Sequence, residues 1–205
     1  GIEMVKKEQA ILITGATRGI GKAAALHLAR HGHLVFATGR DTTRLAELER
    51  EASTEKLAIK VAPLDVTDTP ACTATVTQAI KEFGRLDALV NNAAYSLWGP
   101  LEELALDEVR SVFETNLFSV MGLCQTVLPH MRDQQHGTII NIGSVAGNVA
   151  APVEGPYSMT KFALHSFSRA LRMEVAGFGI RVVLLEPGVI KTDFQANKVI
   201  GDKVF

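Results

Sequence analysis

Three side chains, Ser144, Tyr157 and Lys161, have the types and spacing for acid–base chemistry at an oxygen atom. Tyr157 and Lys161 are four residues apart in a helical pattern, so both project from one face, about a turn apart. A free tyrosine has a pKa of about 10, and a nearby ammonium lowers that pKa by stabilising the phenolate. Ser144 follows an apolar run and offers a hydroxyl to the same oxygen. The set predicts proton exchange with a carbonyl or alcohol oxygen, although Tyr and Lys at this spacing also occur on ordinary helices.

A glycine-rich turn near the N-terminus, Thr14 to Gly21, has the features of a phosphate site. It follows an apolar run over 10–13 and precedes a helical pattern, so free N–H groups and the helix dipole converge there. Gly15 permits the tight turn, Gly19 lets a pyrophosphate approach the backbone, and Gly21 lets helix and strand pack closely. Many turns use glycine, but this placement between strand and helix predicts dinucleotide binding.

The residues after the second predicted strand favour NADP(H), with NAD(H) as the alternative. A carboxylate at that position would accept hydrogen bonds from the ribose hydroxyls of NAD, whereas this chain has Arg40 there. Arg40, with Arg18 in the glycine turn, could grip a 2′-phosphate through charge-assisted hydrogen bonds. Asp41 could partly offset that charge, and both arginines could instead be solvated surface residues. Asp65 and Val66, after the third predicted strand, could bracket the adenine, unless Asp65 is a plain surface aspartate.

Apolar, β-branched runs alternate with helical patterns along the chain, which indicates a parallel sheet with helices on both faces. The predicted strands span 10–13, 34–38, 57–61, 86–90, 137–142 and 180–185. The predicted helices span 22–30, 42–52, about 68–83 with Asp68 as N-cap, 107–132 and 156–176. The glycine turn and the six strands favour a doubly wound, Rossmann-like α/β/α sandwich over an eight-fold barrel. We therefore expect residues 1–205 to form a single NAD(P)-binding domain, with its ligands beyond the carboxyl ends of the strands.

The composition is that of a globular domain. Of the 205 residues, 47% are hydrophobic and 21% charged, and the net charge is −1, so nothing electrostatic points to nucleic acid or an anionic membrane. The apolar runs are too short to span a bilayer, and no signal-peptide core is present. Cys72 and Cys124 lack metal-ligand spacing, as do His130, His136 and His165, so we expect reduced packing cysteines, no metal site and a cytoplasmic protein.

Taken together, these motifs resemble the short-chain dehydrogenase/reductase family. The matching pieces span almost the whole chain: Thr14-Gly15-x-x-x-Gly19-x-Gly21, Asp65, Asn91-Asn92-Ala93, Asn116, Ser144, Tyr157-x-x-x-Lys161, and Pro187-Gly188 followed by Thr192. The resemblance implies that Tyr157 is the general acid/base and that Lys161 binds the nicotinamide ribose and lowers the tyrosine pKa. It also implies that Ser144 positions the substrate carbonyl and that Asn116 holds a water in the proton relay to Lys161.

The same resemblance extends to the cofactor. Thr192 would contact the carboxamide, the Asn92–Ala93 segment would line the adenosine ribose, and Arg40 is typical of the NADP(H)-preferring members. The expected cofactor-binding residues are Gly15, Thr17, Arg18, Gly19, Ile20, Gly21, Arg40, Asp65, Val66, Asn92, Ala93, Tyr157, Lys161, Pro187, Gly188, Ile190 and Thr192.

Two features depart from the family pattern. The usual Asn-Asn-Ala-Gly reads Asn-Asn-Ala-Ala here, and Ala94 tolerates fewer backbone conformations than glycine, which predicts local strain or a small shift. The chain also stops at Phe205, where family members usually continue with helices over the substrate and a last strand. We therefore expect a truncated chain or one that has lost its lid, with the sixth strand at an exposed edge and the pocket open to water.

Apolar residues in the predicted loops suggest an apolar ketone or secondary alcohol as substrate, such as a steroid, a retinoid or a lipid-derived carbonyl. The expected substrate-binding residues are Tyr95, Trp98, Ser144, Val149 and Tyr157. The loop residues could equally close the core.

Both long predicted helices carry more apolar residues than one stripe needs, which suggests a homodimer or homotetramer. The leading functional hypothesis is an NADPH-dependent carbonyl reductase. A non-catalytic cofactor-binding sensor or scaffold and an NAD-dependent alcohol dehydrogenase are the alternatives.

Overall fold

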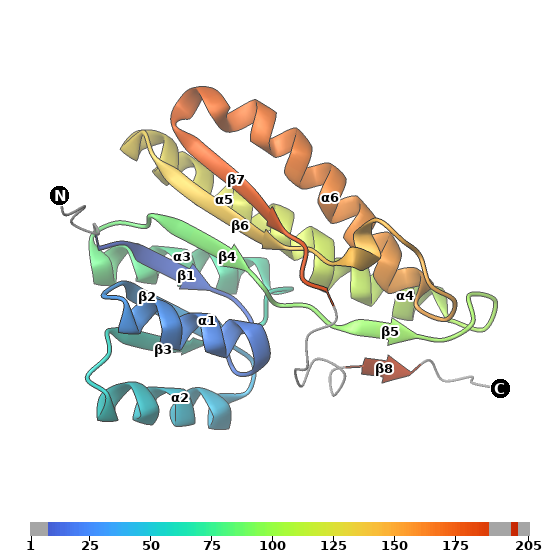
Figure 1. The fold of residues 1–205 in the computed structure, drawn as a ribbon, viewed down its shortest axis with the longest axis horizontal. Helices are drawn as coiled ribbons and strands as arrows, with labels where there is room; N and C mark the ends of the chain where they lie inside the picture. The colour runs from blue at the N-terminus through green and yellow to red at the C-terminus, as the bar shows by residue number, and fades with distance from the viewer. Residues whose placement is uncertain (1–7, 189–197, 201–205) are drawn as a thin grey trace.

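Six parallel strands form the central sheet of the computed structural model, which describes residues 8–188 and 198–200 (Figure 1). The strand order is β3-β2-β1-β4-β6-β7. The strands are β1 (Ala10–Ile13), β2 (Leu34–Gly39), β3 (Ile59–Pro63), β4 (Ala88–Asn91), β6 (Gly137–Ile142) and β7 (Ile180–Leu185). The helices are α1 (Gly19–Arg30), α2 (Thr42–Thr54), α3 (Thr69–Phe83), α4 (Leu106–Phe113), α5 (Ser119–Gln134) and α6 (Gly155–Val175). The predicted doubly wound α/β fold is confirmed.

Alternation along the strands divides the core into two layers. On β1, Leu12 packs with α3, α5 and α6, whereas Ile11 and Ile13 face α1 and α2. On β2, Phe36 lies in the first layer and Val35 in the second. Successive side chains of a strand point to opposite faces, so both faces of these strands are covered by helices. Within the described residues β7 is an edge strand, as expected.

The chain crosses over between β3 and β4, which places β1 and β4 side by side. Ile11 to Ile13 pair in parallel with Ala88 to Val90, and the N–H of Thr14 continues the ladder to the carbonyl of Val90 (3.0 Å). Such a switch in strand order opens a crevice at the carboxyl ends of the strands. The glycine turn after β1 and the Asn92 segment after β4 therefore meet there.

Helix boundaries follow local capping. The Asp68 carboxylate accepts the N–H of Ala71 (2.9 Å) and Pro70 lies in the first turn, as expected for the start of α3. Asp41 caps α2 by accepting the N–H of Arg44 (3.0 Å). The first helix begins at Gly19 rather than at Lys22, so the end of the glycine turn is already helical.

Three expectations about the elements need correction. The helix predicted over 107–132 is divided into α4 and α5 by a π-helical turn, Glu114–Phe118, in which the N–H of Ser119 bonds to the carbonyl of Glu114. The third and fourth strands begin two residues later than predicted. Two short strands, β5 (Ser96–Trp98) and β8 (Lys198–Ile200), form a separate parallel pair. Three-residue strands are too short to show an alternating pattern.

The apolar residues of the long helices mostly belong to the core. Leu117, Leu123, Val127, Leu164 and Leu171 are all buried. The large hydrophobic side chains that stay exposed on these helices are Leu106, Phe118, Met159, Phe162 and Met173. The surplus expected for an oligomer interface is therefore smaller than the sequence pattern suggests. In the part of the chain that the structure describes, no helix is long and apolar enough to cross a membrane.

Candidate active site

The glycine turn after β1 is closed by contacts that leave no room for side chains. Gly15 and Gly19 have φ angles of +65° and +54°, in the left-handed region that favours glycine. A Cβ atom on Gly15 would lie 2.8 Å from the Cα of Ala93, and one on Gly21 would overlap the carbonyl of Gly15. The backbone at the N-terminus of α1 is therefore exposed toward a ligand, as a phosphate site requires.

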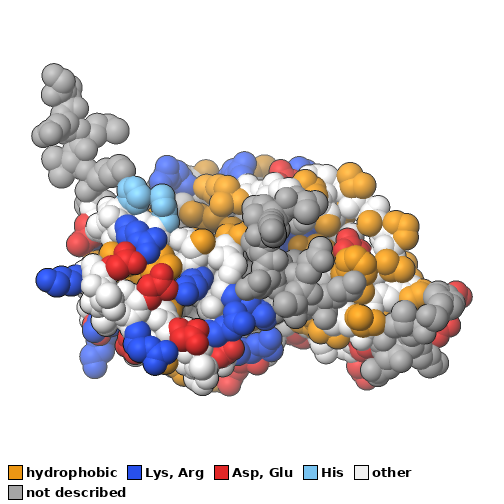
Figure 2. Space-filling view, turned by 60° about the horizontal axis from the view of Figure 1, so that its bottom comes forward, with side chains coloured by type: hydrophobic (Ala, Val, Ile, Leu, Met, Phe, Trp, Pro, Cys, Tyr) orange, Lys and Arg blue, Asp and Glu red, His pale blue; other side chains and the backbone are white. Residues whose placement is uncertain are grey.

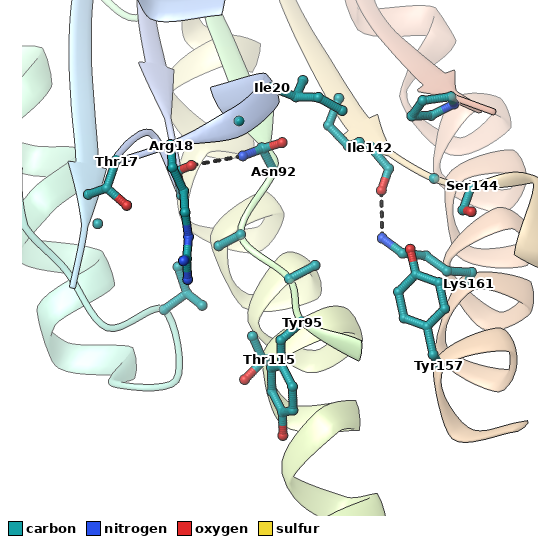
Figure 3. Close-up of a pocket in the computed structure, with 18 of the residues that line it drawn as sticks. Thr17, Arg18, Ile20, Asn92, Tyr95, Thr115, Ile142, Ser144, Tyr157 and Lys161 are labelled. Carbon is teal, nitrogen blue, oxygen red and sulfur yellow. Dashed lines mark hydrogen bonds between the residues drawn. The ribbon is translucent and has the colours of Figure 1, made fainter. Parts of the chain in front are cut away.

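Thr14 and Asn92 hold the turn against the segment after β4. The Thr14 hydroxyl accepts the N–H groups of Asn92 and Ala93, both at 3.1 Å. The Asn92 amide donates to the carbonyl of Gly15 at 3.0 Å (Figure 3). Sequence reasoning gave Thr14 no role of its own, although a hydroxyl at the start of the turn was the available signal. Ala94 does not adopt a left-handed backbone conformation, so it carries no strain of that kind.

A cavity of about 380 Å³ runs along the carboxyl ends of the strands. Most of the predicted site residues line it: Gly15, Thr17, Arg18, Gly19, Ile20, Arg40, Asp65, Val66, Asn92, Ala93, Tyr95, Ser144, Tyr157, Lys161, Pro187 and Gly188. Four predicted site residues do not line the cavity: Gly21, Asn116, Trp98 and Val149. Ile190 and Thr192 lie outside the described residues.

Arg18 and Arg40 mark one end of this cavity. Neither forms an ion pair with another described residue. Asp41, which was expected to offset Arg40, is engaged with Arg44, whose Nε lies 3.4 Å from the Asp41 carboxylate. The Asp65 carboxylate accepts the N–H and hydroxyl of Thr67 (2.9 and 2.7 Å), and these bonds, with a smaller effect of Arg40, lower the pKa of Asp65. The arginines are thus available to an anionic ligand.

Ser144, Tyr157 and Lys161 meet at the other end (Figure 3). Lys161 is 3% exposed and donates from Nζ to the carbonyl of Ile142 at 2.8 Å. Burial lowers the pKa of Lys161 to about 8. Its ammonium lies 5.6 Å from the centre of the Tyr157 ring.

The expected lowering of the Tyr157 pKa by Lys161 is not found. Burial raises the pKa of Tyr157, a hydrogen bond with the Ser144 hydroxyl lowers it in part, and the charge of Glu154 raises it further. Because the ammonium of Lys161 is directed to the carbonyl of Ile142, desolvation is the dominant effect on the tyrosine. The geometry therefore favours a protonated Tyr157, which can donate a proton to a substrate oxygen.

Asn116 lies in the π-helical turn, and its side chain braces the loop after β4. Its Oδ1 accepts the N–H of Tyr95 (3.1 Å), and its Nδ2 donates to the carbonyl of Tyr95 (2.9 Å) and to Thr160 (3.2 Å). The neighbouring Thr115 lines the cavity. π-Helical turns are frequent at functional sites, and this one was hidden inside a continuous helical pattern. Glu154 and Ile142, which also line the cavity, carried no recognisable signal in the sequence.

The residues proposed for substrate contact are divided. Tyr95 lines the cavity, but Trp98 donates from its ring nitrogen to the Ser96 hydroxyl (2.9 Å) and Val149 is 69% exposed. Figure 2 shows charged side chains of both signs over the half that holds α1 and α2, and hydrophobic ones over the half that holds β5. Exposed Val153 lies beside the end of β5, because its carbonyl accepts the N–H of Gly99 (2.9 Å), and Leu101, three residues after β5, is exposed as well. Val153 also has a left-handed φ of +58°, which is strained for a β-branched residue.

Comparison with known proteins agrees with this geometry. The family profile described as short chain dehydrogenase matches residues 9–202. The chain is 39% identical to the 3-ketodihydrosphingosine reductase of Bacteroides thetaiotaomicron over 194 residues, which cover 95% of this chain and 68% of that protein.

Two solved structures are similar in fold and sequence. One is a short-chain dehydrogenase/reductase from Burkholderia phymatum in complex with NAD (26% identity, TM-score 0.90, covering 93% of this chain and 69% of that one). The other is a metagenomic short-chain oxidoreductase in complex with NADP (32% identity, TM-score 0.83, covering 89% and 83%). The chain belongs to the short-chain dehydrogenase/reductase family and is an oxidoreductase of that type.

Proposed function

We propose that this protein is an NADP(H)-dependent reductase that converts a ketone or aldehyde on an apolar substrate to the alcohol. One observation carries the proposal. One cavity holds the glycine turn and two arginines that form no ion pair with another described residue at one end, and Ser144, Tyr157 and Lys161 at the other. The residues fit an extended anionic cofactor whose reactive end meets a proton donor.

The roles of the catalytic residues follow from their positions. NADPH, when bound, supplies the hydride for the carbonyl carbon. Tyr157 donates its phenolic proton to the carbonyl oxygen, which its raised pKa favours by keeping it protonated. Ser144, hydrogen-bonded to Tyr157, orients the same oxygen. Lys161 would hold the nicotinamide ribose through its ammonium, and Asn116 fixes the loop that carries Tyr95.

The preference for NADP(H) rests on Arg18 and Arg40. A guanidinium can form paired, charge-assisted hydrogen bonds with a 2′-phosphate, and no carboxylate follows β2 until Asp41, which is occupied as the cap of α2. Asp41 nevertheless lines the cavity, and one similar structure contains NAD. NAD(H) is therefore the second candidate cofactor.

The substrate class rests on the apolar half of the surface near Tyr157. Leu101, on the loop after β5, and Val149 and Val153, on the loop before α6, are exposed, although they do not line the cavity itself. Burial of an aliphatic chain against them would contribute about 0.8 kcal/mol per methylene. A relative is named for its action on 3-ketodihydrosphingosine, which makes a lipid-derived ketone the leading candidate, ahead of steroid and retinoid carbonyls. We further propose that exposed Phe118, Met159 and Phe162 contribute to a homodimer or homotetramer interface.

A turnover assay tests the proposal. The loss of NADPH absorbance would be followed with a series of 3-ketones of increasing chain length, together with a steroid ketone, retinal and a small polar ketone as control. We expect kcat/KM to rise with chain length by at least tenfold across the series. Binding of NADPH without turnover of any carbonyl would contradict the proposal and favour a cofactor-binding sensor or scaffold.

A further inference from the structure

His165 is a buried titratable residue that the proposed reaction does not use. It follows Tyr157 and Lys161 at four-residue spacing on α6, so the three side chains share one face of the helix. The residue is 3% exposed, and neither ring nitrogen has a hydrogen-bond partner among the described residues. A buried polar group without a partner costs about 1–3 kcal/mol, so its presence here needs an explanation.

The imidazole lies directly beneath the segment that carries Ser144. A Cβ atom on Gly143 would come within 2.7 Å of Nε2, and one on Gly147 would overlap the ring. Between these two glycines, Ser144, Val145 and Ala146 all line the cavity. Both glycines are thus required for the ring to pack against this segment, which places His165 in direct contact with the backbone on either side of Ser144.

The carboxylate of Glu186, the first residue after β7, lies beside the His165 ring. Glu186 Oε1 lies 3.3 Å from His165 Nδ1 and accepts the side-chain N–H of Asn148 at 2.5 Å. The next two residues, Pro187 and Gly188, line the cavity. Glu186 therefore contacts His165 on α6 and Asn148 at the end of the Ser144 segment. Glu186 itself belongs to the segment after β7, which forms another part of the cavity wall.

We propose that Glu186 and His165 are positioning residues, which together with Asn148 form a clasp that sets the distance between the Ser144 segment and the Pro187–Gly188 segment. The clasp holds two walls of the cavity that the proposed function assigns to cofactor and substrate, so the inference rests on that function.

The charge of the clasp depends on pH. Burial lowers the pKa of His165, Glu186 raises it, and Arg169 and Lys161 of the same helix lower it. Neither the Gly143–Gly147 segment nor the end of β7 brings another charged side chain to the ring. The ring is therefore mainly neutral above pH 6.5. Protonation at lower pH converts the contact with Glu186 into an ion pair, which draws the two walls together.

Two conservative variants test the clasp. His165→Phe keeps a ring against Gly143 and Gly147 but removes both nitrogens, and Glu186→Gln removes the charge from a side chain that is 40% exposed. NADPH affinity would be measured by fluorescence titration between pH 5.5 and 8 for both variants and the double variant. We expect each single variant to bind about fivefold more weakly, and the double variant no more weakly than either. The wild type should bind more tightly as the pH falls below 6.5, and both variants should lose this dependence.

His136→Phe provides the matched control, because His136 pairs with Asp87 (2.7 Å) at the opposite edge of the sheet. It should leave NADPH affinity unchanged. An NMR titration of the His165 ring tests the contact without any cofactor. Because Glu186 raises the pKa of His165, that pKa should fall in Glu186→Gln. Additive losses in the double variant, wild-type affinity in His165→Phe, or an unchanged His165 pKa in Glu186→Gln would overturn the clasp. Absence of carbonyl turnover with the affinity pattern intact would instead overturn the proposed function alone.

Discussion

At the amino edge of the sheet, Asp87 accepts hydrogen bonds from the N–H of Ala10, from Arg85 and from His136, all at 2.7 Å. At the carboxyl edge, by contrast, the buried Lys161 ammonium donates to one carbonyl at 2.8 Å. Burial would raise the pKa of Asp87, but its three hydrogen bonds lower it overall, whereas burial lowers the pKa of Lys161 to about 8.

The difference separates groups that hold the fold from groups that act on a ligand. The Asp87 carboxylate already accepts hydrogen bonds from three groups of the fold. Its charged form therefore stabilises the folded state and is not available to a ligand. Groups at the carboxyl edge retain the cost of desolvation, as shown by the lowered pKa of Lys161 and by the buried ring of His165. Shifted pKa values are concentrated where proteins do chemistry. Substitutions at the carboxyl edge should therefore change activity or cofactor affinity, whereas substitutions at the amino edge should change the stability of the fold.

The largest effect should come from Tyr157→Phe at the carboxyl edge. The variant removes the phenolic proton and keeps the ring, so kcat/KM for carbonyl reduction should fall by about a thousandfold or more. NADPH affinity should stay within about threefold of wild type, because the phenol contributes little to cofactor binding in this account. Steady-state kinetics and a cofactor titration on the same preparation measure both. Retention of most of the activity would remove Tyr157 from the acid/base role.

Asp87→Asn, at the amino edge, should instead lower the stability of the fold and leave NADPH affinity unchanged. The amide cannot satisfy the three donors around Asp87, so the free energy of unfolding should fall by about 3 kcal/mol. Because the pKa of Asp87 is lowered in the fold, the wild-type contribution is present above about pH 4 and is lost as the pH falls further. Urea unfolding at pH 7 and at pH 3 measures this change. A loss of NADPH affinity in the folded variant would mean that the two edges are not independent.

Arg40→Ala tests the anionic end of the cavity. NADPH should bind about thirtyfold more weakly, since a charge-assisted hydrogen bond to phosphate is lost, and NADH should change by less than about twofold. Arg50→Ala is the matched control, because it removes the same charge from an exposed residue of α2 that does not line the cavity. Equal losses for both cofactors would exclude Arg40 from the phosphate.

The smallest predicted effects are two opposite shifts in the pH profile. The charge of Glu154 raises the pKa of Tyr157 and the Ser144 hydrogen bond lowers it. Reduction requires the protonated phenol, so activity is lost as the pH rises through that pKa. Glu154→Gln should move this loss to lower pH by a few tenths of a unit, and Ser144→Ala should move the residual activity to higher pH. Rate profiles between pH 7 and 10.5 measure the shifts, and two shifts in the same direction would be inconsistent with these contacts.

Much of the fold and of the site was readable from the sequence, because glycine turns and apolar runs act locally. Gly15, Arg18 and Tyr157 lie in one cavity as predicted, since parallel strands deliver their carboxyl ends to one edge. The π-helical turn around Asn116 was not predicted, because buried apolar residues continue before, within and after it (Val112, Leu117 and Val120) and the sequence reads as one helix. The raised pKa of Tyr157 depends on burial, which no spacing reveals.

The contacts of Glu186 also could not be predicted from the sequence. Its contact with His165 joins residues 21 positions apart on two elements, and no short motif encodes such a pair. Thr14 is similar, because its bonds to Asn92 and Ala93 cross from β1 to β4. Both contacts arise from the strand order and not from neighbouring residues.

The most direct test of the central claim is a titration of the protein with NADPH and with NADH under identical conditions. We predict that NADPH binds at least tenfold more tightly, because Arg18 and Arg40 line the cavity and can donate charge-assisted hydrogen bonds to a 2′-phosphate. Equal affinities or a preference for NADH would contradict the assigned role of the arginines, and absence of binding to either would contradict the cofactor site itself.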